Sequence, residues 1–88
     1  SRPALPPVPD FDPTGVEEAV VVALRKGQDD VRAEPRSAGK WGRLAQLFLA
    51  HTHPDKADLC FQTASRLAPA EPRWPFFRGV LHRRYDPA

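Results

Sequence analysis

The stretch "WGRLAQLFLAHTHPDKADLCFQTASRLAP" (residues 41–69) decides the fold. It contains two apolar stripes with helical spacing: Trp41, Leu44, Ala45 and Phe48 in its first part, and Ala57, Cys60, Phe61, Ala64 and Leu67 in its second. The interval between the stripes contains Pro54, and a proline disfavours helix in the residue that precedes it. We therefore predict two helices, over residues 38–51 and 54–68, joined by a short turn.

The joining segment "HTHPD" (residues 51–55) contains two histidines one residue apart, which raises the question of a metal site. Structural roles account for these residues without a metal. His51 would end one helix, where the helix dipole favours a cation. His53 would cap the next helix, with Pro54 in its first position. A tetrahedral zinc site needs three or four ligands. The further candidates are Asp55, Cys60 and His82, and Cys60 lies on an apolar stripe. We predict a turn here and no metal.

A further helix is expected on each side of this pair. Before it, apolar residues at helical spacing predict a helix over residues 14–34: Val16, Val20, Ala23, Leu24, Gly27 and Val31. Thr14 and Glu17 have the spacing of a capping box, so this helix is expected to start at Thr14. After the pair, a helix over residues 72–84 would carry Trp74, Phe77, Val80 and Leu81. Pro75 is tolerated in its first turn, because the amides there have no intrahelical partner.

The first thirteen residues, "SRPALPPVPDFDP", contain five of the eleven prolines. Proline removes backbone donors and holds the chain near polyproline II. We interpret residues 1–13 as a leader or linker and residues 14–88 as the helical domain. The spacing of Pro3 and Pro6 would also suit a proline-binding groove on a partner. The spacer interpretation is favoured by the composition.

The chain resembles itself at an offset of 34 residues. This offset pairs identical residues at four places: Ala23 with Ala57, Arg32 with Arg66, Pro35 with Pro69, and Leu47 with Leu81. A period of 34 residues, with a Trp, Leu, Gly, Tyr pattern in one helix and an Ala, Phe, Pro pattern around the next, is typical of tetratricopeptide repeats. Eight positions fit that pattern in register: Trp41, Leu44, Ala45, Phe48, Ala57, Phe61, Ala64 and Pro69.

Residues 38–71 therefore resemble one complete tetratricopeptide repeat, and the flanking segments resemble partial ones. Residues 14–37 look like the second helix of a preceding repeat, with Gly27 at an aromatic position. Residues 72–88 look like the first helix of a following repeat, with Trp74 one position early. The fold expected from this resemblance is all-α, a solenoid fragment of about four antiparallel helices.

The resemblance also implies a function, because such arrays are non-catalytic scaffolds that bind peptides or proteins on a concave face. The positions carried over to that face are Gly42, Arg43 and Gln46 from the complete repeat, and Arg73, Phe77 and Val80 from the following one. Gly42 and Gln46 replace the lysine and asparagine that clamp a C-terminal carboxylate in chaperone-binding members, so that specificity is not expected. Arginine suits bidentate pairing with carboxylates, so Arg43 and Arg73 favour an acidic partner.

Parts of the sequence are also compatible with other functions. The segment "RWPFFRGVLHRRYDP" (residues 73–87) interleaves arginine with aromatic residues, as single-stranded nucleic-acid binders do, but a net charge of +2 is modest for such a function. A docking arm of a larger enzyme and a structural cap for a neighbouring domain are further alternatives. Since about three repeats are normally needed to bury a continuous core, we also expect either a longer parent array or self-association.

The sequence offers little support for catalysis. Cys60 lies on an apolar stripe, and no glycine-rich phosphate loop, paired carboxylates or haem-attachment sequence is present. We therefore expect no enzyme activity and no cofactor. No apolar run approaches the roughly 20 residues that cross a bilayer. A proline-rich leader is compatible with an extracytoplasmic protein as well as with a cytoplasmic one.

Overall fold

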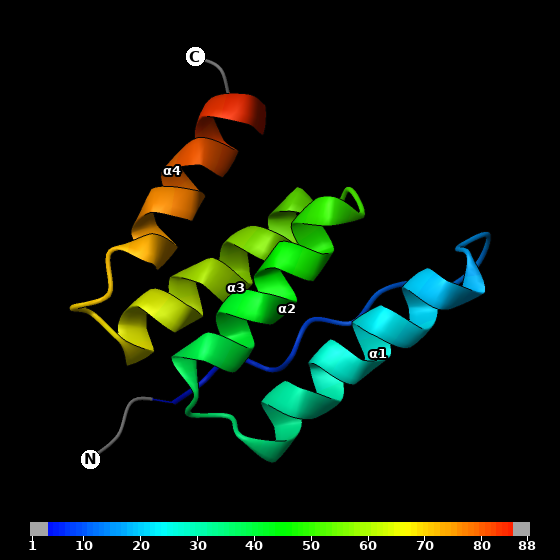
Figure 1. Ribbon diagram of the computed structural model, residues 1–88, viewed down its shortest axis with the longest axis horizontal. Helices are drawn as coiled ribbons and strands as arrows, with labels where there is room; N and C mark the ends of the chain where they lie inside the picture. The colour runs from blue at the N-terminus through cyan, green and yellow to red at the C-terminus, as the bar shows by residue number, and fades with distance from the viewer. Residues whose placement is uncertain (1–3, 86–88) are drawn as a thin grey trace.

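The computed structural model describes residues 4–85, and these residues form helices and no strand (Figure 1). The helices are α1 (Glu18–Ala33), α2 (Ala38–Ala50), α3 (Pro54–Leu67) and α4 (Arg73–Tyr85). The all-α prediction is confirmed. For the last three helices, no predicted end differs from the observed one by more than one residue. Each helix turns back along the one before it, giving a flat body of 39 × 36 × 17 Å. Among the described residues, no helix is long and apolar enough to cross a membrane.

The turn between α2 and α3 has the predicted construction. His51 is the C-cap residue of α2, and its N–H is bonded to the carbonyl groups of Leu47 and Phe48. His53 is the N-cap residue of α3, with Pro54 in the first turn. Thr52 lies between them at φ 62°, in the left-handed region, so the chain reverses within three residues. The histidines thus occupy the structural positions expected of them.

Small residues allow α2 and α3 to pack closely. Ala45, Ala57 and Ala64 are fully buried, as are the larger Phe48 and Phe61 that fill the space around them. Close-packed interiors leave few voids, and small and large side chains are buried together in this core. This helix pair is the centre of the core, as the apolar stripes predict.

The predicted capping box at Thr14 is wrong, because this residue lies in a turn before the helix. The Asp12 carboxylate accepts a hydrogen bond from the Thr14 N–H at 2.9 Å, and Val16 N–H donates to the Pro13 carbonyl at 3.0 Å. That first bond lowers the pKa of Asp12. Gly15, at φ 75°, supplies the positive φ that the third position of a type II turn requires. Helix α1 therefore starts at Glu18, after an N-cap residue whose side chain makes no capping bond.

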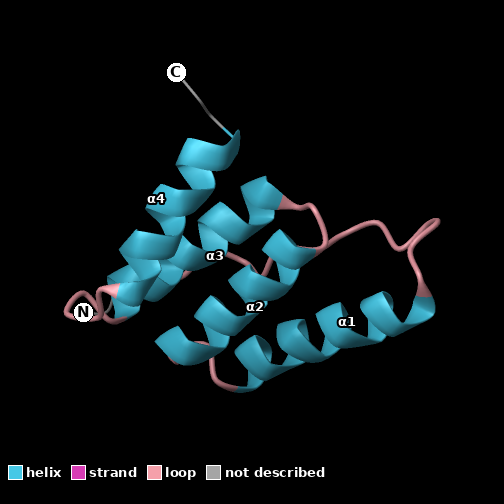
Figure 2. Cartoon of the chain, turned by 45° about the horizontal axis from the view of Figure 1, so that its top comes forward, coloured by secondary structure: helices cyan, strands magenta, loops and turns pink. Residues whose placement is uncertain are grey.

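The described part of the leader lies on the helices, which differs from the free spacer that we expected. It runs in extended form behind α2 and alongside α1 (Figures 1 and 2). Phe11 is only 6% exposed and belongs to the hydrophobic core, and Val8 packs against that core. A boundary at residue 13 therefore does not separate the leader from the domain. Pro3, half of the proposed Pro3 and Pro6 spacing, lies outside the described residues.

One tryptophan of α4 contacts both α2 and α3. Trp74 is 4% exposed and lies directly on Gly42 of α2, while its ring stacks on Phe61 of α3 at 6.3 Å between centroids. Only a residue without a side chain leaves room for the indole at position 42. Pro75 sits in the first turn of α4, as predicted.

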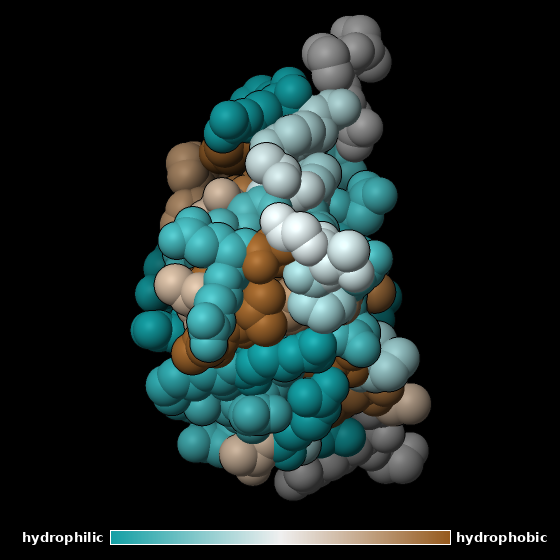
Figure 3. Space-filling model, turned by 90° about the vertical axis from the view of Figure 1, so that its right-hand side faces the viewer, coloured by the Kyte–Doolittle hydropathy of each residue, from teal (hydrophilic) through white to brown (hydrophobic). Residues whose placement is uncertain are grey.

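The side of the molecule that lies to the right in Figure 1 is largely hydrophilic, with apolar atoms in a narrow strip (Figure 3). The large apolar side chains that are exposed within residues 4–85 are Val22, Leu59, Phe76 and Tyr85. Two of these four belong to α4.

Replacing Gly15 with alanine should lower the free energy of unfolding by about 1 kcal/mol, because φ 75° is costly for a residue with a Cβ. Urea unfolding followed by circular dichroism measures this. Gly39→Ala is the matched control. Gly39 lies within α2, where a new Cβ would meet only Ser37 Oγ at 3.8 Å, so alanine there should raise stability by up to about 1 kcal/mol. Equal effects at both positions would contradict the turn.

Gly42→Ala should destabilise the chain by about 1–3 kcal/mol through overpacking, because a Cβ at this position would overlap Cη2 of Trp74. The loss should disappear when Trp74→Ala is also present, since the contact is then absent and alanine is the better helix former. Urea unfolding of the two single variants and the double variant measures the coupling. An equal loss from Gly42→Ala in both backgrounds would show that Trp74 is not its cause.

Candidate partner-binding groove

A groove of about 440 Å³ lies between α2 and α4. We call it the α2–α4 groove, and its lining consists of Gln46, Leu49, Ala50, Thr52, Phe61, Phe77, Arg84 and Tyr85. Apolar carbon from Leu49, Phe61 and Phe77 is combined with the polar ends of Gln46 and Arg84. A concave site with mostly apolar lining and a few polar groups is the usual form of a binding site.

The structure brings together two of the six positions predicted for the partner face. Gln46 and Phe77 line the α2–α4 groove. Arg43 and Arg73 are exposed outside its lining, and Val80 is half-buried and also outside it. The related expectation that Gly42 would be open to a partner is wrong, because Gly42 is buried beneath Trp74. A tryptophan one position early in α4 places its ring over that part of α2.

Sequence reasoning missed the end of the α2–α4 groove, where the last turn of α4 approaches the end of α2. Arg84 and Tyr85 come from α4, and Ala50 and Thr52 from the end of α2 and the turn after it. The Arg84 guanidinium lies 5.5 Å from the centre of the Tyr85 ring, and Tyr85 is 38% exposed. The signal that could have found them is the helical spacing of Phe77, Arg84 and Tyr85, which places the latter two about two turns beyond Phe77.

Helix α4 is the basic part of the molecule, with four arginines and no acidic residue between positions 73 and 85. Two of them have acidic partners: Arg73 Nε lies 2.8 Å from Glu71 Oε1, and Arg78 Nε lies 2.6 Å from Asp58 Oδ1. Arg83 and Arg84 are exposed in the last turn. The positive charge open to a partner is therefore concentrated at the Arg84 end of the α2–α4 groove.

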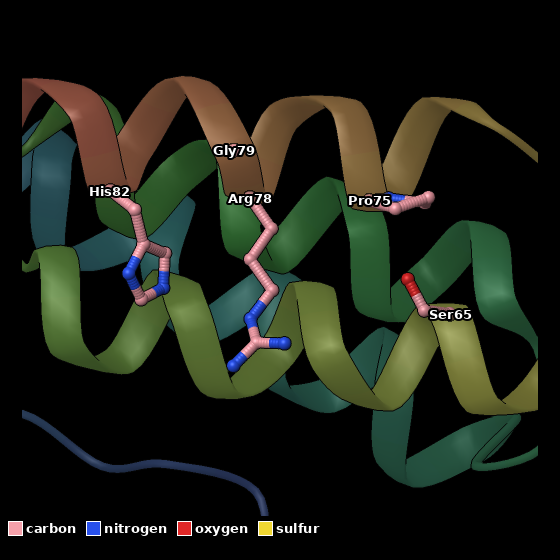
Figure 4. A pocket seen from close by; sticks show the side chains of 5 residues that line it. All are labelled: Ser65, Pro75, Arg78, Gly79 and His82. Carbon is pink, nitrogen blue, oxygen red and sulfur yellow. The ribbon is translucent and has the colours of Figure 1, made fainter.

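A second hollow, of about 440 Å³, lies between α3 and α4 and is lined by Ser65, Pro75, Arg78, Gly79 and His82 (Figure 4). The side chains of Arg78 and His82 reach from α4 toward α3, while Ser65 faces Pro75 (Figure 4).

An ion-pair cluster joins the two helices that border this hollow. Asp58 Oδ1 accepts from Arg78 Nε at 2.6 Å and lies 3.0 Å from His82 Nε2. Partial burial acts to raise the pKa of Asp58, but the hydrogen bonds from Arg78 and His82 outweigh it and hold that pKa below its usual value. The cluster fastens α4 to α3.

Asp58, His82 and Ser65 are the residue types of a hydrolytic triad, but their geometry is not that of one. Ser65 Oγ is buried and makes no hydrogen bond, so no base is in place to activate it. In Figure 4 it lies at the opposite end of the hollow from His82. What the arrangement does chemically is hold an ion pair between helices.

Cys60 is fully buried, and burial raises its pKa to about 12. The thiol is therefore protonated at neutral pH, which is the unreactive form. Within residues 4–85, no group of three or more histidine, cysteine, aspartate or glutamate side chains is placed to hold a metal ion.

Comparison with known proteins adds no relative to this picture. A scan against protein-family models gives no match, and neither does a search of curated proteins or a search of solved structures.

Asp58→Asn should lower the free energy of unfolding by about 1–2 kcal/mol at pH 7, since it removes the charge that Arg78 and His82 share. Because folding lowers the pKa of Asp58, its contribution is present above the unfolded value of 3.8 and is lost as pH falls through the lower folded value. Urea unfolding between pH 7 and pH 2 should therefore show the two curves converging below pH 4.

Asp29→Asn is the control for this prediction. Asp29 pairs with Arg32 at 3.4 Å on an exposed face, so its loss should cost no more than about 0.5 kcal/mol. Equal effects of the two substitutions at pH 7 would show that the Asp58 cluster does not fasten α4.

Proposed function

We propose that the chain is a non-catalytic interaction module that binds a segment of a partner protein in the α2–α4 groove. The observation that carries this proposal is the groove itself, in which the apolar side chains of Leu49 and Phe77 lie beside the polar ends of Gln46 and Arg84. Peptide-binding grooves combine these two components, since apolar area supplies affinity and a few polar groups fix orientation.

The resemblance to tetratricopeptide repeats supports the same proposal. In that family, the first helices of successive repeats lie side by side and line the binding face. Here α2 and α4 would be those helices, and the contact between Trp74 and Gly42 is consistent with such a neighbourhood. Two of the positions carried over from the family, Gln46 and Phe77, line the α2–α4 groove.

The charge of α4 favours an acidic segment with apolar side chains. Arg84 lies at the end of the α2–α4 groove, Arg83 is next to it, and Arg43 and Arg73 are exposed on the same two helices. A segment that enters the groove would place its apolar side chains on Phe77 and its carboxylates near Arg84. Arginine pairs with carboxylates in a bidentate way, which adds specificity as well as affinity.

Single-stranded nucleic acid is the second candidate ligand, and one observation favours it. Phe76 is 62% exposed and Tyr85 is 38% exposed, on the same helix as Arg83 and Arg84. Exposed rings next to arginines can stack on bases while the arginines bind phosphate. Phe76 is equally suited to self-association through α4, which the small number of repeats also favours.

The experiment is affinity capture from a lysate of the source cells with the wild-type chain and two charge-reversal variants. Arg84→Glu should reduce capture of a protein partner by about tenfold or more, a change of about 1.4 kcal/mol. Arg83→Glu is the matched control, because Arg83 has the same charge and helix but lies outside the groove lining. It should reduce capture much less.

Two outcomes would contradict the proposal. Equal losses from the two variants would assign binding to the overall charge of α4 and not to the groove. Capture of nucleic acid, with release that becomes steep as salt rises, would identify the second candidate instead. The pair Arg43→Glu with Arg73→Glu then separates a wider binding face from the groove alone, since both residues lie outside its lining.

A further inference from the structure

The leader residues "VPDF" (8–11) lie against the helices, which contact both the backbone and the side chains of this segment. We call this site the leader crevice and define it by the four residues that contact Pro9, Asp10 or Phe11: Arg25, Gln28, Phe48 and His53. These residues come from α1, α2 and the N-cap position of α3, and the leader crosses α1 and α2 in extended form (Figure 1). None of these four residues lines the α2–α4 groove.

Gln28 makes a hydrogen bond to the backbone of the leader. This residue is fully buried, although glutamine is rarely found inside a protein. Its Nε2 donates to the Pro9 carbonyl at 2.8 Å and lies 3.4 Å from Asp10 Oδ1. A buried amide without partners is costly, so the donor of Gln28 depends on an extended segment in the leader crevice.

The leader crevice also contacts two side chains of the leader, those of Asp10 and Phe11. Phe11 inserts edge-on against Phe48, with 6.4 Å between ring centres, and lies at the same distance from His53. Arg25 closes the site from outside: its guanidinium carbon lies 4.7 Å from the centre of the Phe11 ring, and its Nη1 lies 3.0 Å from Asp10 Oδ1. One arginine therefore recognises an aspartate and the aromatic residue that follows it.

From this geometry we propose that the leader crevice is a second peptide-binding site, specific for an extended Pro-Asp-Phe segment. The chain's own leader occupies it in cis and competes with a matching segment of a partner protein. The chemistry of the ligand is the chemistry that the leader displays: a carbonyl for Gln28, a carboxylate for Arg25 and a buried aromatic ring.

The attachment of the leader suits exchange with such a competitor. Phe11 is the one residue between positions 4 and 13 that is buried, and the Asp10 and Arg25 side chains are 73% and 45% exposed, so their ion pair is weakened by solvent. The turn at Gly15 separates Phe11 from α1. A tethered ligand competes at an effective concentration set by its linker, so a partner segment that displaces the leader needs a higher intrinsic affinity for the site than the leader has.

The test is binding of a fluorescent peptide of residues 4–14, ALPPVPDFDPT, to full-length chains. Phe11→Ala weakens the cis leader and leaves the leader crevice intact, so this variant should bind the peptide at least tenfold more tightly than wild type does. Pro7→Ala is the matched control, because Pro7 is exposed, and it should bind as weakly as wild type. Adding Gln28→Ala to Phe11→Ala, or replacing the phenylalanine of the peptide with alanine, should abolish the tenfold gain.

A folded Phe11→Ala chain that does not bind the peptide would overturn the proposal and leave Phe11 as a core residue only. If Phe11→Ala alone unfolds the chain, Asp10→Arg replaces it, since it sets a like charge beside Arg25 while Phe11 stays. The peptide must then raise the melting temperature of the Asp10→Arg variant. An unchanged melting temperature would overturn the proposal. A wild-type dimer in sedimentation that Phe11→Ala abolishes would also overturn it, because the occupant would then be the leader of a second copy.

Discussion

The close approach of α2 and α3 is the constraint on which the rest of the structure depends. Ala45, Ala57 and Ala64 let the two helices meet, and Phe48 and Phe61 fill the space that remains. A chain of 88 residues buries a small share of its surface, so this one pair cannot shield its own outer faces. The other elements are best understood as covers for those faces.

The two covers differ in kind. On one side, α4 brings Trp74 onto Gly42 and Phe61 and is fastened to α3 at Asp58. On the other side, α1 covers α2, and the gap that it leaves is closed by an extended segment with a single ring, Phe11. The helix α4 leaves the α2–α4 groove beside it. The extended leader lies in the leader crevice, which another segment of the same chemistry could occupy.

Local patterns in the sequence predict α2, α3 and their turn well, because spacing, the His53 cap position and Pro54 all agree. They fail where a residue far along the chain, or an alternative local bond, decides the outcome. Asp12 takes the amide of Thr14 into a turn, against the capping spacing. The proline-rich composition of the leader does not predict the burial of Phe11, because that burial depends on contacts with helices about 40 residues away. In the candidate site, Gln46 and Phe77 were predictable from repeat positions, whereas Gly42 was not, since the ring of Trp74 covers it.

The single cysteine gives this architecture a built-in chemical reporter. Cys60 sits between the central helices with no exposed surface and with its thiol held in the protonated form. A thiol reagent can reach it only through states in which α3 has moved away from its neighbours. The rate at which Cys60 is labelled therefore measures how often the centre of the domain opens, and it does so in the natural sequence without an added probe.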